Sequence, residues 1–357
     1  MESNITSMYL CIHALQVAPV SCINRDDTGT PKTCIYGGTS RMRVSSQCWK
    51  RAVRMYLKER YGDTGIRTKF ISKMISDRLV SEGVCNDKQA TAFVKKWLGQ
   101  ANIISDKDSA KNTSAFFSKE QINSLYDVMR NRIQQENNEE KLESDIAFSN
   151  RLSEAVIDNP SISELLFGRM FASDPSLNYD AACQVAHSFS VNEVYEEPDY
   201  FTVVGDVKQE NALGGSDYLD TKLFNSGVLY RFADINLSKG SELRNEKYNV
   251  DAAKAASQFL EAFVLSMPTG SANAYANMTL PENVIVELRD DVPVSFAPAF
   301  VKAIDSKDIC QDAINEMSLY EEKISHLYGG PVRKWSLGEV SLRELCKQVE
   351  EEINRRL

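Results

Sequence analysis

The chain has 357 residues, a hydrophobic content of 43% and a charged content of 25%, values of a globular protein that can bury a large core. Its formal net charge is -9 at pH 7. No apolar run approaches the ~20 residues that a membrane span needs, and the N-terminal stretch lacks the basic start of a signal peptide. The eight cysteines form no C-x-x-C pair and indicate free thiols in a reducing compartment. We therefore expect a cytoplasmic protein without membrane contact.

The first predicted element is a buried strand over residues 7–17, where apolar and polar side chains alternate. A cationic segment follows it. Between Asp27 and Glu59 the sequence contains no acid and seven basic side chains, namely Lys32, Arg41, Arg43, Lys50, Arg51, Arg54 and Lys58. In a chain with an acidic balance, such a block predicts a polyanionic ligand. The competing interpretation is a solvated surface, because runs of charge are usually only exposed.

The cationic segment begins as a loop, since residues 24–31 are rich in turn-forming side chains. Gly37 and Gly38 then allow the backbone to approach a ligand with no Cβ in the way. Arg41 and Arg43 alternate with apolar residues at strand spacing, so we expect both arginines on one face. Loop and strand would therefore present donors to the same anionic chain.

A helix is expected near residues 46–60, capped by Ser45 and Ser46. Its N-terminal N–H groups suit a phosphate. The buried stripe of this helix is expected to consist of Trp49, Val53, Tyr56 and Leu57. Three basic residues step by four along another face, without an acidic residue four positions away: Lys50, Arg54 and Lys58.

The rest of the chain predicts an α+β protein. Residues 61–185 are mostly helical in pattern, with a capping box at Ser118 and Gln121. Two helices close the chain, the second opened by a capping box at Ser341. Between the helical insertion and these two helices, strand patterns occur at 184–195, 228–237 and 284–288, and a further helix is expected at 251–267. The order strand, helix, strands, helix, strand indicates a ferredoxin-like or RRM-like core with a helical insertion.

The sequence offers little for catalysis. Three histidines are too few and too scattered for a triad or a metal cluster, and His187 lies in an apolar run typical of a buried histidine. Asp26 and Asp27 could hold a metal that cleaves phosphodiesters. Adjacent residues rarely point the same way, however, and an aspartate in such a loop more often caps backbone N–H groups. We therefore expect no catalytic residue, no metal and no cofactor.

Several motifs, in this order, resemble the CasC family, the backbone subunits of the type I-E CRISPR surveillance complex, Cascade. The motifs are Asn24-Arg25-Asp26-Asp27, Lys32, Gly37-Gly38, Arg41-x-Arg43-x-Ser45-Ser46-Gln47, Lys50-Arg51-Ala52-x-Arg54, Leu166-Phe167-Gly168-Arg169-Met170 and Tyr200-Phe201-Thr202. The resemblance implies an RRM-like palm, a helical fingers insertion, a β-hairpin thumb and C-terminal helices packed on the palm. The implied ranges are 1–59 with 186–195 and 223–304 for the palm, 60–185 for the fingers, 196–222 for the thumb and 305–357 for the C-terminal helices.

The resemblance also implies which residues hold a guide RNA. Contacts to the RNA are implied for Asn24, Arg25, Lys32, Gly37, Gly38, Arg41, Arg43, Ser45, Ser46, Gln47, Lys50, Arg51 and Arg54. In the fingers, Arg169 precedes Met170, which would wedge against guide bases. At the thumb, Tyr200, Phe201 and Thr202 would lie over a displaced nucleotide. The sequence departs from the family at Thr39 and Ser40, where relatives often carry basic residues.

A protein of this kind would bind the crRNA without cleaving it. Further copies would stack head to tail along the guide, kink it at regular intervals and present it to target DNA, together with other Cascade subunits, in antiviral defence. One alternative is a metal-dependent ribonuclease that uses Asp26 or Asp27, as in type III relatives. Another is a general single-stranded RNA-binding protein outside any CRISPR complex.

Overall fold

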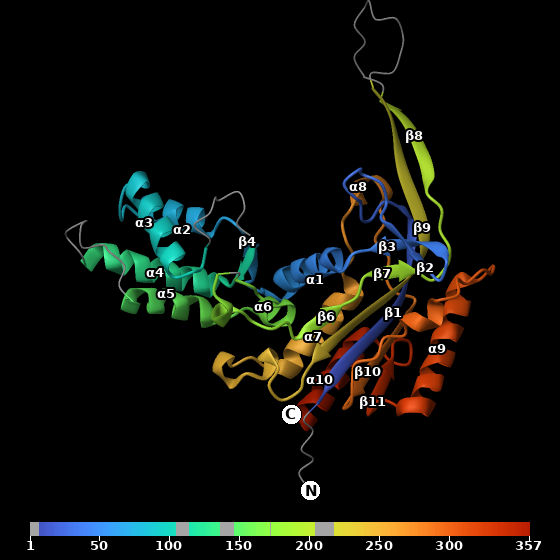
Figure 1. The fold of residues 1–357 in the computed structure, drawn as a ribbon. Coiled ribbons are helices and arrows are strands. Elements are labelled where there is room, and N and C mark those ends of the chain that lie inside the picture. The colour runs from blue at the N-terminus through green and yellow to red at the C-terminus, as the bar shows by residue number, and fades with distance from the viewer. Residues whose placement is uncertain (1–6, 105–113, 136–145, 172, 204–217) are drawn as a thin grey trace, which may run out of the picture. The chain divides into compact units, whose positions relative to one another are not determined.

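The computed structural model describes residues 7–104, 114–135, 146–171, 173–203 and 218–357 (Figure 1). The chain divides into two compact units. The sheet unit comprises residues 1–55, 185–235 and 256–357, and the helical unit comprises residues 56–184 and 236–255. Residues 204–217, which fall in the range expected for the thumb, lie outside the described residues.

The sheet unit is built on one sheet with the strand order β11-β10-β1-β9-β7-β3-β2, with β6 and β8 also pairing with β9. Its strands are β1 (Tyr9–Ser21), β2 (Thr33–Tyr36), β3 (Thr39–Val44), β6 (Cys183–Val185), β7 (Ser188–Ser190), β8 (Glu197–Val203), β9 (Tyr218–Asn236), β10 (Asn283–Arg289) and β11 (Arg333–Ser336). The helices α8 (Ala272–Tyr275), α9 (Ile309–Tyr328) and α10 (Leu342–Arg356) lie within this unit. The helices α1 (Ser46–Tyr61) and α7 (Ala252–Leu265) lie mostly in it, and residues 56–61 and 252–255 are grouped with the helical unit.

Four strands of this sheet and two helices form the expected core. The path β10-β1-β9-β7, with α1 following β1 and α7 following β9, is the split βαβ arrangement of a ferredoxin-like fold. The predicted α+β fold class is therefore confirmed.

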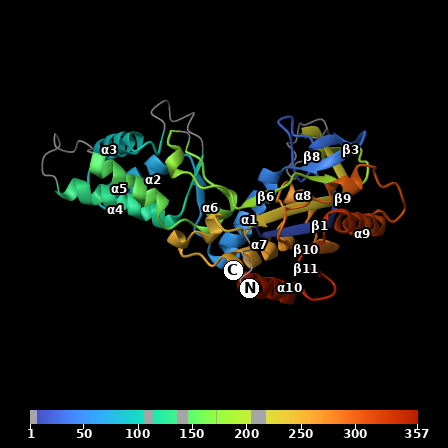
Figure 2. The same cartoon turned by 60° about the horizontal axis from the view of Figure 1, so that its bottom comes forward.

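The two faces of the sheet are covered by different helices, as Figure 2 also shows. Consecutive residues of a strand point to opposite faces. On β9, Tyr230 joins a core cluster with Met317 of α9. Its neighbour Arg231 places its guanidinium over the rings of Trp49 on α1 and Phe263 on α7. The helix that carries the cationic segment thus packs on the face opposite α9.

Two strands of the sheet, β2 and β11, were not expected from the sequence. β11 lies between the two C-terminal helices and pairs antiparallel with β10, with Trp335 opposite Val286. The stretch is only four residues long and begins with two exposed basic residues, so it lacks a clear strand pattern. The second C-terminal helix does begin after Ser341, whose side chain accepts from the N–H of Glu344, which confirms the predicted cap.

The helical unit contains α2 (Ile71–Ser81), α3 (Asp87–Gln100), α4 (Lys119–Gln135), α5 (Ile146–Ile157) and α6 (Ile162–Phe167) around a core of its own. The capping box before α4 is confirmed, because Ser118 and Gln121 each accept from the other's N–H at 3.0 Å. A small two-stranded sheet of β4 (Ile66–Thr68) and β5 (Ala115–Phe117) was not expected.

Residues 236–255 group with the helical unit, whereas the family resemblance implied that they lie in the palm. Side-chain contacts explain the difference. The ring of Tyr248 meets that of Tyr179 edge-on, with centroids 5.5 Å apart. Lys247 forms a 3.1 Å ion pair with Asp158. Such contacts join stretches far apart in sequence, and no local pattern predicts them.

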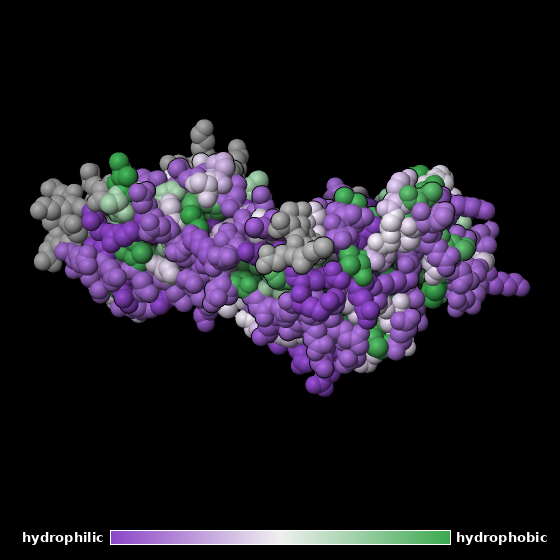
Figure 3. Space-filling model, turned by 90° about the horizontal axis from the view of Figure 1, so that it is seen from below, coloured by the Kyte–Doolittle hydropathy of each residue, from purple (hydrophilic) through white to green (hydrophobic). Residues whose placement is uncertain are grey.

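No helix among the described residues is long and apolar enough to cross a membrane. The face drawn in Figure 3 is predominantly hydrophilic, with small separate hydrophobic areas. All eight cysteines are free thiols.

Candidate nucleic-acid interface

The turn between β2 and β3 explains the glycine pair. Tyr36 pairs with Thr39, so Gly37 and Gly38 form a two-residue hairpin loop. Their φ angles, 60° and 84°, are both positive, as a type I′ turn requires. A Cβ on Gly37 would lie 1.6 Å from the carbonyl oxygen of Val301, whereas one on Gly38 would meet open space. Packing within the protein thus requires a glycine at position 37, whereas the exposed backbone of both glycines stays accessible.

Hydrogen bonds tie the loop before β2 to the start of α1. The side-chain oxygen of Asn24 accepts from the N–H of Ser45 at 2.9 Å. The carbonyl of Asn24 accepts from the N–H of Lys32 at 2.8 Å. Ser45 is buried, and its Oγ accepts from the N–H of Cys48, which confirms it as the helix cap. Asn24 and Ser45 were expected to contact RNA. In the structure their side-chain oxygens accept hydrogen bonds from the backbone and so position the cationic segment.

The carboxylate of Asp26 organises the tip of the same loop. It accepts from the N–H and hydroxyl of Thr28 at 2.9 and 2.7 Å, and from the N–H and hydroxyl of Thr30 at 3.0 and 2.9 Å. These bonds, that of the Thr28 hydroxyl foremost, lower the pKa of Asp26 to about 2. Arg25 beside it is exposed. The arrangement is a capped turn, the structural role that the sequence favoured.

Arg41 is not available to a ligand in this structure, which corrects the expectation for it. The side chain is fully buried. Its Nε donates to the hydroxyl of Thr39 at 2.8 Å. Its two terminal nitrogens donate to four carbonyl oxygens, those of Ser190, Val191, Phe300 and Val301. Arg41 therefore joins β3 to the chain after β7 and to the loop before α9. The Thr39 hydroxyl is engaged by this arginine.

Arg43 on β3 contacts His187, a residue that the sequence analysis expected to be buried. It is half-buried, and its Nη1 lies 3.0 Å from Nδ1 of His187. His187 is exposed, so the expectation of a buried histidine is wrong. The histidine inside the core is His13, fully buried, with Nδ1 2.9 Å from the hydroxyl of Tyr230. The apolar residues around His187 did not reveal its exposure. His187 lies outside the sheet, just before β7, a strand of only three residues.

Helix α1 presents the remaining basic residues of the segment. Its stripe is as predicted at Trp49, Val53 and Leu57, which are buried, whereas Tyr56 is half-buried. The indole N–H of Trp49 donates to Ser188 at 2.8 Å, which fixes the helix on the sheet. The polar positions face outward to different degrees: Gln47 and Arg51 are exposed, and Ser46, Lys50 and Arg54 are half-buried.

In the helical unit, the two expected site residues have opposite surroundings. Met170 is 67% exposed and open to a ligand. Arg169 is buried, pairs with Glu164 at 3.2 Å and donates to the carbonyl of Leu177. The expectation that Arg169 contacts RNA is thus corrected to a structural role, that of fixing the segment that carries Met170.

The β8–β9 hairpin carries the expected aromatic site. Tyr200 is 65% exposed, Thr202 is exposed and Phe201 is half-buried. Phe201 lies opposite Asp220 on β9, and the ammonium group of Lys222 lies 4.8 Å from the centre of its ring. The hairpin therefore combines accessible aromatic surface with a cation, which suits the stacking of bases.

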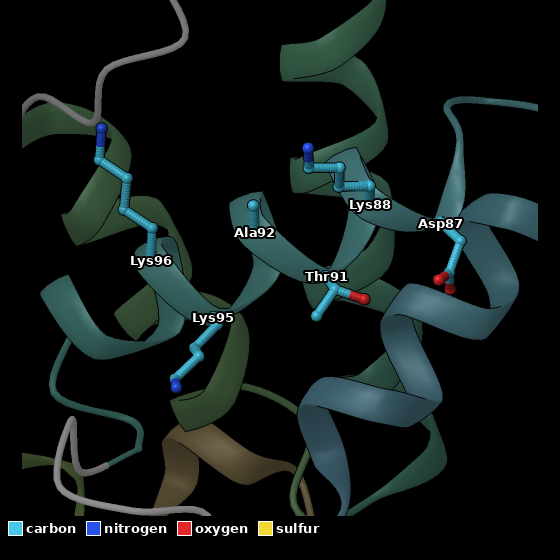
Figure 4. A pocket seen from close by; sticks show the side chains of 6 residues that line it. All are labelled: Asp87, Lys88, Thr91, Ala92, Lys95 and Lys96. Carbon is cyan, nitrogen blue, oxygen red and sulfur yellow. The ribbon is translucent and has the colours of Figure 1, made fainter.

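A separate cationic depression lies on α3 in the helical unit (Figure 4). It is lined by six residues of that helix, Asp87, Lys88, Thr91, Ala92, Lys95 and Lys96. None of the residues expected in the site takes part in it.

Fold and site together define a class of protein: a ferredoxin-like α+β core with a helical insertion, an aromatic hairpin and a cationic loop and helix suited to a polyanion. The chain belongs to the CT1975-like protein family, whose profile matches residues 10–355. No curated protein matches it.

Two solved structures are similar over nearly the whole chain. A chain of "CRISPR RNA-guided surveillance complex, pre-nicking" is 32% identical with a TM-score of 0.82. A chain of "CRISPR RNA-guided surveillance complex" is 28% identical with a TM-score of 0.62. Each alignment covers 98% of this chain and 100% of the other.

Proposed function

We propose that this protein is the crRNA-binding backbone subunit of a type I-E Cascade surveillance complex. The observation that carries the proposal is the 32% identity, over 98% of the chain, to a chain of an RNA-guided surveillance complex. The cationic segment supports it, because a guide RNA is a polyanion. The motifs shared with the CasC family support the type I-E assignment.

The proposed contacts fall into two groups. Backbone phosphates and sugars are held by the accessible polar residues Arg25, Lys32, Arg43, Ser46, Gln47, Lys50, Arg51 and Arg54. Such contacts set register and affinity but read no sequence, as a variable guide requires. Met170, Tyr200, Phe201 and Thr202 lie against bases, and their apolar and aromatic surface tolerates any sequence. Asn24, Gly37, Arg41, Ser45 and Arg169 hold these residues in place.

The partners follow from the same proposal. Several copies stack head to tail along the crRNA, a heterologous contact that builds a filament rather than a closed dimer. The bound guide pairs with target DNA, so that base pairing carries the specificity and an R-loop forms. Other Cascade subunits complete the particle, in the cytoplasm.

We further propose that the subunit does not cleave RNA. Four hydrogen bonds occupy the carboxylate of Asp26, and no group of three or more possible metal ligands occurs in the part of the chain that the structure describes. Incubation of guide RNA with the protein and Mg²⁺ or Mn²⁺ should leave the RNA intact. Regularly spaced cuts that disappear in Asp26→Asn or Asp27→Asn would overturn this part of the proposal.

Co-expression with the genomic neighbours, followed by purification and sequencing of the bound RNA, tests the function. We expect uniform repeat–spacer RNAs in a particle of several subunits. RNA of mixed length and origin would instead favour a general single-stranded RNA-binding protein. A purified chain free of RNA, from cells that contain the guide, would contradict both.

A further inference from the structure

His187 lies just before β7 and close to two basic residues, Arg43 and Lys32. Its Nδ1 is 3.0 Å from Nη1 of Arg43. A guanidinium nitrogen can only donate, so Nδ1 must accept. The imidazole is therefore neutral in this arrangement, with its proton on Nε2, and the ring is exposed.

The charges around this imidazole favour an anion. Partial burial lowers the pKa of His187 below its ordinary value, and Arg43 and Lys32 lower it further. Among the described residues, the charged groups that perturb the pKa of His187 are thus the cations of Arg43 and Lys32. Cys34 on β2, which Arg43 also influences, has its pKa raised by burial and stays a neutral thiol. Arg41 nearby on β3 is fully buried and bonded to carbonyl oxygens.

We propose that Lys32, Arg43 and His187 form one phosphodiester subsite, and that His187 gains a proton when a phosphate occupies it. This inference rests on the proposed function and adds a residue to its contacts. The proton comes from solvent and binds to Nδ1, which then donates to a phosphate oxygen. The N–H of Arg43 that pointed to Nδ1 turns to the same phosphate, so no donor is left without an acceptor.

The sign of the effect follows from linkage. A phosphate beside the ring stabilises the imidazolium and raises the pKa of His187 above its value in the free protein. Affinity for the phosphate must then increase as pH falls through the interval between the two pKa values. Because one pKa unit corresponds to a tenfold change in an equilibrium constant, we expect RNA binding to strengthen several-fold to about tenfold between pH 7.5 and pH 5.5.

Two measurements on the full chain test the subsite. The first is an NMR titration of the histidine ring signals, alone and with inorganic phosphate, in which loss of a signal in His187→Gln assigns the residue. The second is the affinity for an oligouridylate of about 12 nucleotides at pH 7.5 and 5.5. The matched control is His326→Gln, since His326 is an exposed histidine on α9.

Wild type and His326→Gln should share the same gain in affinity at low pH, and His187→Gln should lose most of it. Phosphate should raise the pKa of His187 and leave the ring signals of His326 unchanged. An equal gain in all three proteins, with no effect of phosphate, would overturn the subsite while RNA binding stands. If oligouridylate does not bind at any pH but phosphate still raises the pKa of His187, the subsite stands and the proposed RNA function falls.

Discussion

Three of the arginines that are buried in the described part of the chain hold other chain segments in place with their guanidinium groups. Arg41, Arg169 and Arg231 are at most 4% exposed. Arg41 donates chiefly to carbonyl oxygens, whereas Arg169 divides its hydrogen bonds between one carbonyl and two side chains. The guanidinium carbon of Arg231 lies 3.7 Å from the centre of the Trp49 ring. A buried guanidinium stays charged and needs acceptors for five N–H groups, so each fixes several chain segments at once. Positive charge in the sequence therefore marks two different roles in this fold.

The buried carboxyl group of Glu287 on β10 should make the stability of the protein depend on pH. Burial raises its pKa to about 7, although Arg289 lies 3.5 Å away. The folded protein therefore keeps a proton that the unfolded chain releases above about pH 4.5, and stability falls as pH rises from there to about 7. The glutamine side chain of Glu287→Gln does not titrate, so the variant does not lose this stability as pH rises. The free energy of unfolding of Glu287→Gln relative to wild type should therefore increase by up to about 3 kcal/mol between pH 4.5 and 8.

Urea unfolding of both proteins at several pH values measures this difference. Glu322→Gln, an exposed residue of α9, is the matched control and should follow wild type at every pH. A stability difference between Glu287→Gln and wild type that does not change with pH would show that Glu287 is ionised in the folded protein throughout.

How much of the site the sequence could predict depends on the residue. The cap at Ser45 is a local feature, and the structure contains it. The different burial of Arg41 and Arg43 is not local, because the acceptors of Arg41 come from residues 190–191 and 300–301. His187 could not be predicted as a site residue for the same reason, because it is placed there by its contact with Arg43, which is far away in the sequence.

At the scale of elements, α1 is the part of the cationic segment whose contribution can be isolated. Lys50 and Arg54 lie one turn apart on it, and the core contacts of the helix are made by other residues. Replacing both with Ala should weaken RNA binding for every guide sequence. Because each lost phosphate contact releases one counterion fewer, the slope of log affinity against log salt should flatten by roughly 0.7 per contact.

The control for this helix is the pair Lys323→Ala and Lys347→Ala, which removes the same charge from α9 and α10. It should leave the salt slope unchanged. If both double variants flatten the slope equally, the protein's net charge is responsible and α1 is solvated surface, the alternative that the sequence left open.

Prediction of the elements succeeded where a hydrophobic period runs over many residues. β1, α1 and α7 begin and end close to their predicted limits. The pattern was weak in the short strands β11 and β4, which pair with β10 and β5. Residues 236–255 group with the helical unit through ring and ion-pair contacts, which local periodicity does not reveal.

In the whole assembly, a head-to-tail filament differs from a closed oligomer in how its number of subunits is set. A heterologous contact does not close on itself, so the length of the guide determines how many copies assemble. Native mass spectrometry of particles reconstituted on two guide RNAs, which differ by about 12 nucleotides, measures the copy number directly. The longer guide should carry at least one more subunit, and protein without RNA should not form the same series. A copy number that stays fixed as the guide lengthens would indicate a closed oligomer, whose isologous contacts limit its size whatever RNA it binds.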